Sequence, residues 1–312
     1  MILTEMGLKG TIERIEKFLL HDIWQLDMET ISHAKARFVR YVRVLFITIR
    51  TFSSERIGNQ AVCLSFFGTM AMVPFIAVTF AITDGFGLRE YLQRMIYEYF
   101  DTSQEVVDQV IKYADNIIAA AQSNALGLIS ALLFVWLIFW MMLNVEAAFN
   151  HVWKVKKSRN FLRRLAVYGT ILLISPFVVL IMFSAFFMYG NAFDSIGFGA
   201  EVTDTLKSGI AWIVVYVLTV LVLTAMYKFI PNKKVYFGPA FRAALISALF
   251  FVILQYLYIE TQLFVARLSA IYGAVAAIPL FMFWMNFCWF IILFGAEISY
   301  AFQNVNNYNL DD

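Results

Sequence analysis

The residues of this sequence that could do chemistry are polar groups set inside or beside long apolar stretches. Glu146 lies near the end of one stretch, with Asn150 one helical turn further on, and Glu297 lies near the end of the last, with Asn286 three turns earlier on the same helical face. An ionisable residue inside a membrane span is costly and commonly marks a binding site, an ion pathway or a gate. Five further candidates lie at the ends of neighbouring stretches: Arg163, Arg164, Arg242, Glu260 and Arg267.

Two interpretations of these candidates stay open. Both glutamates are about 20 residues from the outer start of their helices, which places them near the membrane boundary rather than at its midplane. One interpretation is structural: they pair with Arg163, Arg164 and Arg242 and fix the helix ends in register. The other is functional: they form a cytoplasmic gate or a binding cluster for a cation or a headgroup.

Several other chemistries are disfavoured by the sequence. None of the three histidines, His21, His33 and His151, has a second histidine or a cysteine at metal-ligand spacing, so we expect neither a metal nor a cofactor. The phosphate-loop pattern Gly-x-x-x-x-Gly-Lys-Ser/Thr and the nucleophile-elbow pattern Gly-x-Ser-x-Gly are both missing. We therefore expect no catalytic residues, no enzyme activity and no ATP site in this chain.

The elements that must position these residues are membrane-spanning helices. Of 312 residues 61% are hydrophobic and 15% are charged, whereas a soluble domain has about half its residues apolar and roughly a quarter charged. A helix needs about 20 apolar residues to cross the hydrocarbon core. The sequence predicts an all-α, polytopic helical bundle with six spans, at about 61–83, 124–148, 166–190, 210–230, 242–266 and 276–302.

The charges of the connections predict the orientation of the bundle. Residues 33–56, 149–165 and 228–242 are rich in Lys and Arg, whereas residues 84–123 and 191–209 are mainly acidic. Positively charged connections remain in the cytoplasm, so we expect both termini there. The basic segments are then topology signals, and we expect no nucleic-acid partner. No cleavable signal peptide is expected, because the first 30 residues carry six acids and no continuous apolar core.

Segments outside the spans have predicted roles of their own. Residues 1–56 should form two helices outside the membrane, of which the second, over 33–55, is either a basic anchor on headgroups or a regulatory, partner-binding element. Residues 84–123 should form two short amphipathic helices that cap the bundle or act as a lid. Residues 304–312 form a short tail.

Trp153 is expected at the inner headgroups. Three prolines are expected to kink their spans: Pro74, Pro176 and Pro279.

The chain resembles the YihY/BrkB family of bacterial inner-membrane proteins, once labelled ribonuclease BN-like. The likeness covers about residues 40–303 and lies in the order of several short motifs rather than in any one of them. These motifs are Leu64-Ser65-Phe66-Phe67 with Val73-Pro74-Phe75; Ala148-Phe149-Asn150-His151-Val152-Trp153 with Arg163-Arg164; Ile230-Pro231 with Gly238; and Tyr272-Gly273, Pro279-Leu280 and Gly295-Ala296-Glu297-Ile298-Ser299. The chain departs from the family at Ser65-Phe66-Phe67, where the family's first helix often has Ala-Tyr-Tyr.

The resemblance implies a six-helix integral domain of the bacterial inner membrane. The ribonuclease label does not fit this sequence, because no metal cluster or acid–base pair in a basic cleft is evident. The leading hypothesis is a transporter or a lipid-handling protein without its own ATPase, with the Glu146 and Glu297 region as inner gate. Its partners would be membrane lipids and a small amphipathic or osmolyte cargo, and a homo-oligomer is compatible with it. The alternative is a non-transporting scaffold that binds partners through its basic cytoplasmic face.

Overall fold

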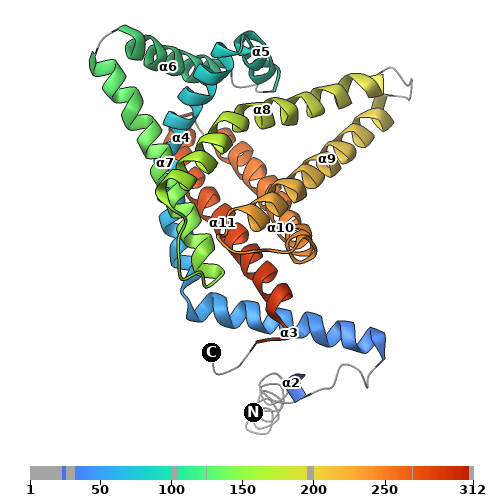
Figure 1. Ribbon diagram of the computed structural model, residues 1–312. Coiled ribbons are helices and arrows are strands. Elements are labelled where there is room, and N and C mark those ends of the chain that lie inside the picture. Colours follow the sequence, from blue (N-terminus) through green and yellow to red (C-terminus); the bar gives the residue numbers. More distant parts are fainter. Residues whose placement is uncertain are drawn as a thin grey trace.

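The computed structural model describes residues 23–25, 32–99, 104–123, 125–194, 200–268 and 270–308, and every regular element in these ranges is a helix. The elements are α2 (Ile23–Gln25), α3 (His33–Ser54), α4 (Ile57–Gly85), α5 (Arg89–Tyr99), α6 (Gln104–Ser123), α7 (Ala125–Val152), α8 (Phe161–Asp194), α9 (Ala200–Phe229), α10 (Phe237–Leu268) and α11 (Ala270–Asn304). Figure 1 shows the long helices side by side, with α3 running across one end and α5 and α6 gathered at the other.

Six of these helices, α4 and α7 to α11, are long and apolar enough to cross a membrane. Each predicted span lies within one of them, to within a residue at its ends. They are apolar around most of their circumference, as expected of helices that face lipid on one side and protein on the other. The predicted all-α bundle of six membrane helices is therefore confirmed.

Small residues allow α9, α10 and α11 to pack closely. One face of α10 carries four alanines with no exposed surface, Ala240, Ala243, Ala244 and Ala248, and α10 packs against both α9 and α11. Small residues at such spacing let membrane helices approach one another. On α11, a side chain at Gly295 would overlap the hydroxyls of Tyr227 and Ser247, and its Cβ would lie 2.8 Å from Tyr227 Cζ. Only glycine allows this approach.

The end of the bundle that carries α3 also carries the connections α7–α8 and α9–α10, and we call it the basic end. Polar contacts tie these pieces together: Gln303 near the end of α11 donates to Lys234 O (3.1 Å), and its Oε1 accepts from Tyr236 N–H (2.9 Å). Phe52 of α3 packs edge-on against Phe290 of α11, with ring centroids 4.8 Å apart. The three basic connections predicted from the sequence thus meet at one end.

The buried Arg43 of α3 fastens α2 to the basic end. Its guanidinium donates to the carbonyl of Ile23, with Nε at 2.9 Å, and its Cζ lies 5.3 Å from the centroid of the Trp24 ring. Burial lowers the pKa of Arg43 from its ordinary value. The first of the two predicted N-terminal helices lies outside the described residues apart from α2, and the last residues of the tail, 309–312, also lie outside them.

Helices α5 and α6 form a second small core at the opposite end, on α4 and α8. Its buried members are Phe80, Leu92, Met95, Val107, Ile111, Ala114 and Leu180. An ion pair between Arg89 and Asp115 and a hydrogen bond that Tyr97 donates to Asp108 join α5 to α6. The bond to Asp108 raises the pKa of Tyr97. These are the two short amphipathic helices expected between the first two spans, each burying its apolar face.

The three prolines lie inside helices that continue through them: Pro74 in α4, Pro176 in α8 and Pro279 in α11. Pro74 and Pro176 are buried, whereas Pro279 is exposed. A proline removes one backbone donor wherever it lies within a helix. The kink at each position stays a prediction.

Candidate functional site

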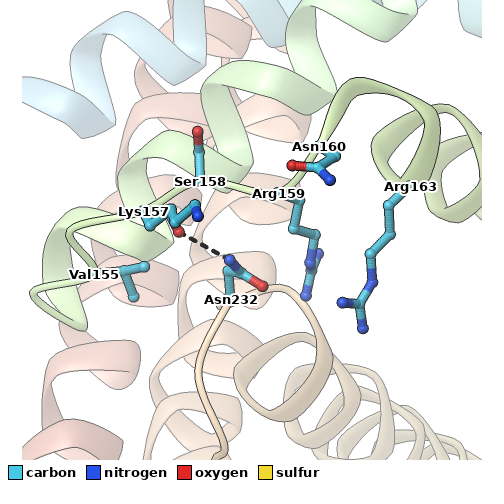
Figure 2. Close-up of a pocket in the computed structure, with 7 residues that line it drawn as sticks. All are labelled: Val155, Lys157, Ser158, Arg159, Asn160, Arg163 and Asn232. Atoms are coloured by element: carbon cyan, nitrogen blue, oxygen red, sulfur yellow. Dashed lines mark hydrogen bonds between the residues drawn. The ribbon is translucent and has the colours of Figure 1, made fainter.

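Glu146 is the centre of a polar network at the basic end. Its side chain has 0% exposed surface, and its Oε2 lies 3.2 Å from Nε of Arg164 in the first turn of α8. Asn150, one turn further along α7, donates from Nδ2 to Oε1 of Glu146 (3.2 Å) and accepts from the backbone N–H of Asn232 (2.7 Å). Asn232 in turn donates to the carbonyl of Lys157 (2.9 Å; Figure 2). The network therefore joins α7, α8 and the α9–α10 connection.

The end of α7 is a tight turn that places two side chains. Val155 N–H donates to Asn150 O (2.8 Å) and Lys154 N–H to His151 O (3.0 Å), and Lys154 adopts a left-handed conformation with φ of 50°. This is the Schellman pattern of helix termination, in which glycine is usual at the left-handed position. The turn brings Lys154 Nζ to 3.9 Å and His151 Nε2 to 3.4 Å from the carboxylate of Glu55.

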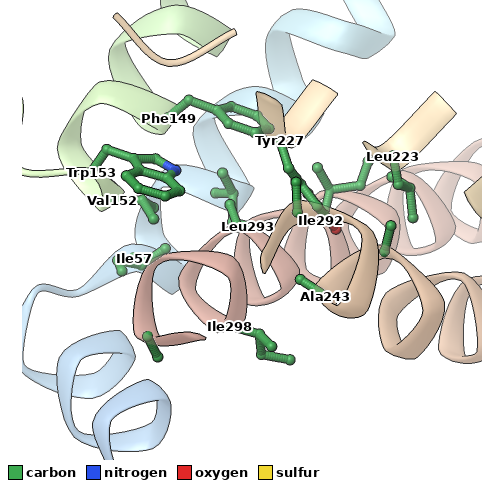
Figure 3. Packing of buried hydrophobic residues seen from close by; sticks show 14 of the residues in the cluster. Ile57, Phe149, Val152, Trp153, Leu223, Tyr227, Ala243, Ile292, Leu293 and Ile298 are labelled. Atoms are coloured by element: carbon green, nitrogen blue, oxygen red, sulfur yellow. The ribbon is translucent and has the colours of Figure 1, made fainter. Parts of the chain in front are cut away.

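Trp153, in the same turn, is fully buried with no exposed surface. Its ring packs edge-on against Tyr300 of α11, with centroids 5.6 Å apart, and Figure 3 shows it beside Val152 and Phe149 above α11. The expectation that Trp153 anchors at the headgroups is wrong. The reversal of the chain at Lys154 turns the preceding side chain inward, into the core.

Glu297 of α11 is the second buried carboxylate, and its surroundings differ from those of Glu146. It has 0% exposed surface, and neither carboxylate oxygen has a hydrogen-bond partner among the described residues. Tyr300 lies three residues along the helix and so on the same face, which puts Glu297 on the face of α11 that Trp153 covers.

Hydroxyl groups lie at the opposite face of α11, and two of them come from neighbouring helices. Tyr227 of α9 and Ser247 of α10 meet over Gly295, and both side chains are buried. Ser299, one turn further along α11, has no exposed surface, and its Oγ has no hydrogen-bond partner in the described part of the chain. Figure 3 shows Tyr227 next to Phe149, with ring centroids 6.3 Å apart, among apolar neighbours. Polar atoms thus flank α11 on two faces at the level of Glu297.

The structure brings some predicted site residues together and separates others. Arg164 pairs with Glu146, whereas its neighbour Arg163 is exposed and lines a cavity between the α7–α8 and α9–α10 connections. Arg242 is exposed, with Cζ 5.5 Å from the centroid of the Phe302 ring. Asn286 is half-buried in α11, and Glu260 is exposed near the opposite end of α10. The side chain of Arg267 lies outside the described residues.

Some residues of this region were not singled out by the sequence. Arg159 and Asn232 hold the two basic connections together, but in the sequence they are one residue of a basic run and one residue of a turn. In the sequence, Tyr227 and Ser247 are ordinary members of apolar spans. Among the residues that the structure describes, no group of three His, Cys, Asp or Glu side chains is placed to hold a metal ion.

Six helices that are long and apolar enough to cross a membrane define a multi-pass integral membrane protein. The chain belongs to the BrkB family: the family model described as "Virulence factor BrkB" matches residues 48–312, which confirms the resemblance found in the sequence. No solved structure matches the chain.

Its relatives are bacterial proteins named UPF0761 membrane proteins. The one from Acinetobacter baylyi is 30% identical over 269 residues, which cover 83% of this chain and 61% of the relative. The one from Paraburkholderia xenovorans is 30% identical, with 80% and 57% covered, and the one from Alteromonas mediterranea is 26% identical, with 89% and 96% covered. The chain thus spans about 60% of the first two relatives and nearly all of the third. Their names describe membrane proteins and no catalytic activity.

Proposed function

We propose that this protein is a membrane transporter or lipid-handling protein that works without an ATP site of its own, and that the buried polar groups at the basic end, Glu146, Asn150 and Glu297, form its inner gate. The observation that carries the proposal is Glu297: it is fully buried in a membrane helix, and neither of its oxygens has a hydrogen-bond partner among the described residues.

An uncompensated buried carboxylate is hard to explain as a packing element. Leaving a buried polar group without a partner costs about 1–3 kcal/mol, and more for a charged group, whereas an apolar side chain at position 297 would cost nothing of this kind. Such residues in membrane helices are commonly retained because they bind a proton, an ion or part of a cargo. Glu297 would take this role here.

The surroundings of Glu297 support a gate rather than a static ion pair. Lys154 and His151 are both within 4 Å of Glu55 at the surface of the basic end. The turn that holds Lys154 also packs Trp153 against Tyr300, on the face of α11 that carries Glu297. Lys154 can therefore be attracted either outward to Glu55 or inward to Glu297. A charge with two alternative partners is a physical basis for switching between a closed and an open gate.

The orientation follows from the positive-inside rule. The basic end would face the cytoplasm of a bacterium, with both termini on that side of the inner membrane, and the gate would control access from the cytoplasm. The cargo would be a lipid, an amphipath or a small osmolyte, since the chain is apolar around the core and offers few ionised groups within the spans.

Mass spectrometry of the gently extracted protein tests this proposal. We expect at least one lipid or amphipath that is enriched over the bulk membrane lipid in the wild type to be lost in Glu297→Gln, while the yield of folded protein is unchanged. Glu90→Gln, an exposed glutamate on α5, is the matched control and should retain the molecule.

Two outcomes would overturn the proposal. Equal loss of the bound molecule and of folded protein in Glu297→Gln would make Glu297 a structural residue. Retention of bulk lipid only, together with stoichiometric protein neighbours that are lost on removal of residues 1–56, would favour the non-transporting scaffold.

A further inference from the structure

A cavity at the basic end lies between the α7–α8 connection, the first turn of α8 and the α9–α10 connection (Figure 2). It has a volume of about 360 Å³ and adjoins a second cavity of the same size, with which it shares Arg159, Arg163 and Asn232. The two cavities together form one hollow, which we call the cationic hollow.

The residues that line the cationic hollow carry a strong excess of positive charge. Its six ionisable side chains are Lys157, Arg159, Arg163, Lys228, Lys233 and Lys234, and no acidic residue lines it. Like charges gathered around one cavity repel one another unless an anion lies between them. The hollow therefore has the electrostatics of an anion site.

The floor of the hollow is built from fixed contacts. Nη2 of Arg159 donates to the carbonyls of Phe229 (2.8 Å) and Pro231 (3.1 Å) at the end of α9, and Asn232 is held through its backbone by Asn150. Nη1 of Arg159 is buried and has no hydrogen-bond partner among the described residues. A buried guanidinium nitrogen ordinarily has an acceptor, so Nη1 of Arg159 is placed to donate to a ligand in the hollow.

Arg163 offers a second guanidinium beside the first. Figure 2 shows the side chains of Arg159 and Arg163 extending in the same direction, next to Asn232. The side chain of Arg163 is exposed and makes no hydrogen bond or ion pair with any residue that the structure describes. Paired guanidinium groups suit the oxygens of a phosphate, to which each can donate two hydrogen bonds.

The hollow lies at the level where lipid phosphates are found. The span of α8 begins at Phe161 and that of α9 ends at Phe229, so Arg159 is two residues outside one span and Lys233 four residues outside the other. Phe161 and Leu162 are 61% and 79% exposed, and Phe229 is 64% exposed. Apolar side chains exposed beside a set of cations mark the boundary between hydrocarbon and headgroups.

We propose that the cationic hollow binds the phosphate headgroup of an anionic membrane lipid, with Arg159 Nη1 and Arg163 as the donors and Lys157 and Lys233 supplying further charge. The acyl chains would lie along the exposed apolar side chains of α8 and α9. The site is separate from Glu297, and its existence does not depend on transport.

Titration of the delipidated, full-length protein with short-chain phosphatidylglycerol and phosphatidylcholine tests the site by native mass spectrometry. We expect preferential binding of phosphatidylglycerol, and a loss of affinity of about tenfold in Arg163→Gln, because a charge-assisted hydrogen bond is removed. Arg94→Gln, which removes an exposed arginine at the opposite end of the bundle, should bind like the wild type. Arg163 is chosen before Arg159 because it holds no other element.

Three results would overturn the proposal. The first is equal binding of the two lipids by the wild type, and the second is an equal effect of Arg163→Gln and Arg94→Gln. The third is displacement of phosphatidylglycerol by inorganic phosphate at the same concentration, which would assign the hollow to a soluble anion. Binding of phosphatidylglycerol without transport would contradict the proposed function alone and leave the lipid site intact.

Discussion

Glu146 of α7 and Arg164 of α8 form an ion pair across two helices, with 3.2 Å between Oε2 and Nε, although these two atoms lack the alignment of a hydrogen bond. Glu297 has no comparable partner in the described part of the chain. Two glutamates with similar positions, each near the end of its span that lies at the basic end, thus have different surroundings. Under the proposed function, Glu146 would belong to the scaffold of the gate, whereas Glu297 would bind a ligand or a proton.

The ion pair predicts that substitution of Arg164 destabilises the protein, whereas substitution of the neighbouring Arg163 does not. Arg164→Gln should lower the free energy of unfolding by about 2 kcal/mol, less than for a fully buried pair because the Arg164 side chain is 24% exposed. Thermal unfolding in detergent measures this. Arg163→Gln is the matched control and should have no effect; equal losses in the two variants would contradict the assigned pair.

In the double variant Glu146→Gln with Arg164→Gln, no uncompensated charge remains. We expect it to regain part of the stability that Arg164→Gln loses, because the two residues interact directly. Strictly additive losses would show that the two side chains do not interact.

The close approach of Tyr227 and Ser247 to Gly295 predicts that any larger side chain at position 295 causes a packing defect. Gly295→Ala should destabilise the protein by about 1–3 kcal/mol, because the added methyl group overlaps Tyr227 and Ser247. Gly169→Ala is the control: no atom lies within 4 Å of an added Cβ at that helical position, so alanine should be neutral or favourable there. Thermal unfolding compares the two, and equal stability of both variants would contradict the packing described for α9, α10 and α11.

The docking of α2 depends on Arg43. Arg43→Gln should expose the chain next to α2 to protease, because the hydrogen bonds to Ile23 and the contact with Trp24 are both lost. Limited proteolysis followed by mass spectrometry should show faster cleavage near residues 23–25. In Arg37→Gln, which removes only a local bond to His33, cleavage should stay at the wild-type rate.

The six-helix fold could be predicted from the sequence because its signals are local. The length of each apolar run and the charge of each connection determine a span and its orientation one at a time. Packing detail could not be predicted in this way. Arg163 and Arg164 are neighbours in sequence, and only the rotation of α8 about its axis decides which one meets Glu146.

The buried site could be predicted only in part, because the sequence shows which residues are polar but not how they pack. Polar residues within apolar runs drew attention to Glu146 and Glu297, but the sequence alone could not distinguish the paired glutamate from the unpaired one. The cationic hollow needs two connections that are about 70 residues apart in the chain to meet, as Arg159 and Pro231 do. Trp153 has the sequence context of an interfacial residue, and only the turn at Lys154 makes it a core residue.

The most direct test of the account is transport in proteoliposomes of the molecule that stays bound during gentle extraction. Wild type and Glu90→Gln should move it across the vesicle membrane at equal rates, and Glu297→Gln should be slower by at least about tenfold, the effect of roughly 1.4 kcal/mol at one buried polar group. Thermal unfolding of each variant establishes that it is equally folded. Movement by the wild type no faster than in protein-free vesicles, or equal rates for wild type and Glu297→Gln, would contradict the central claim that Glu297 is the working group of a gate.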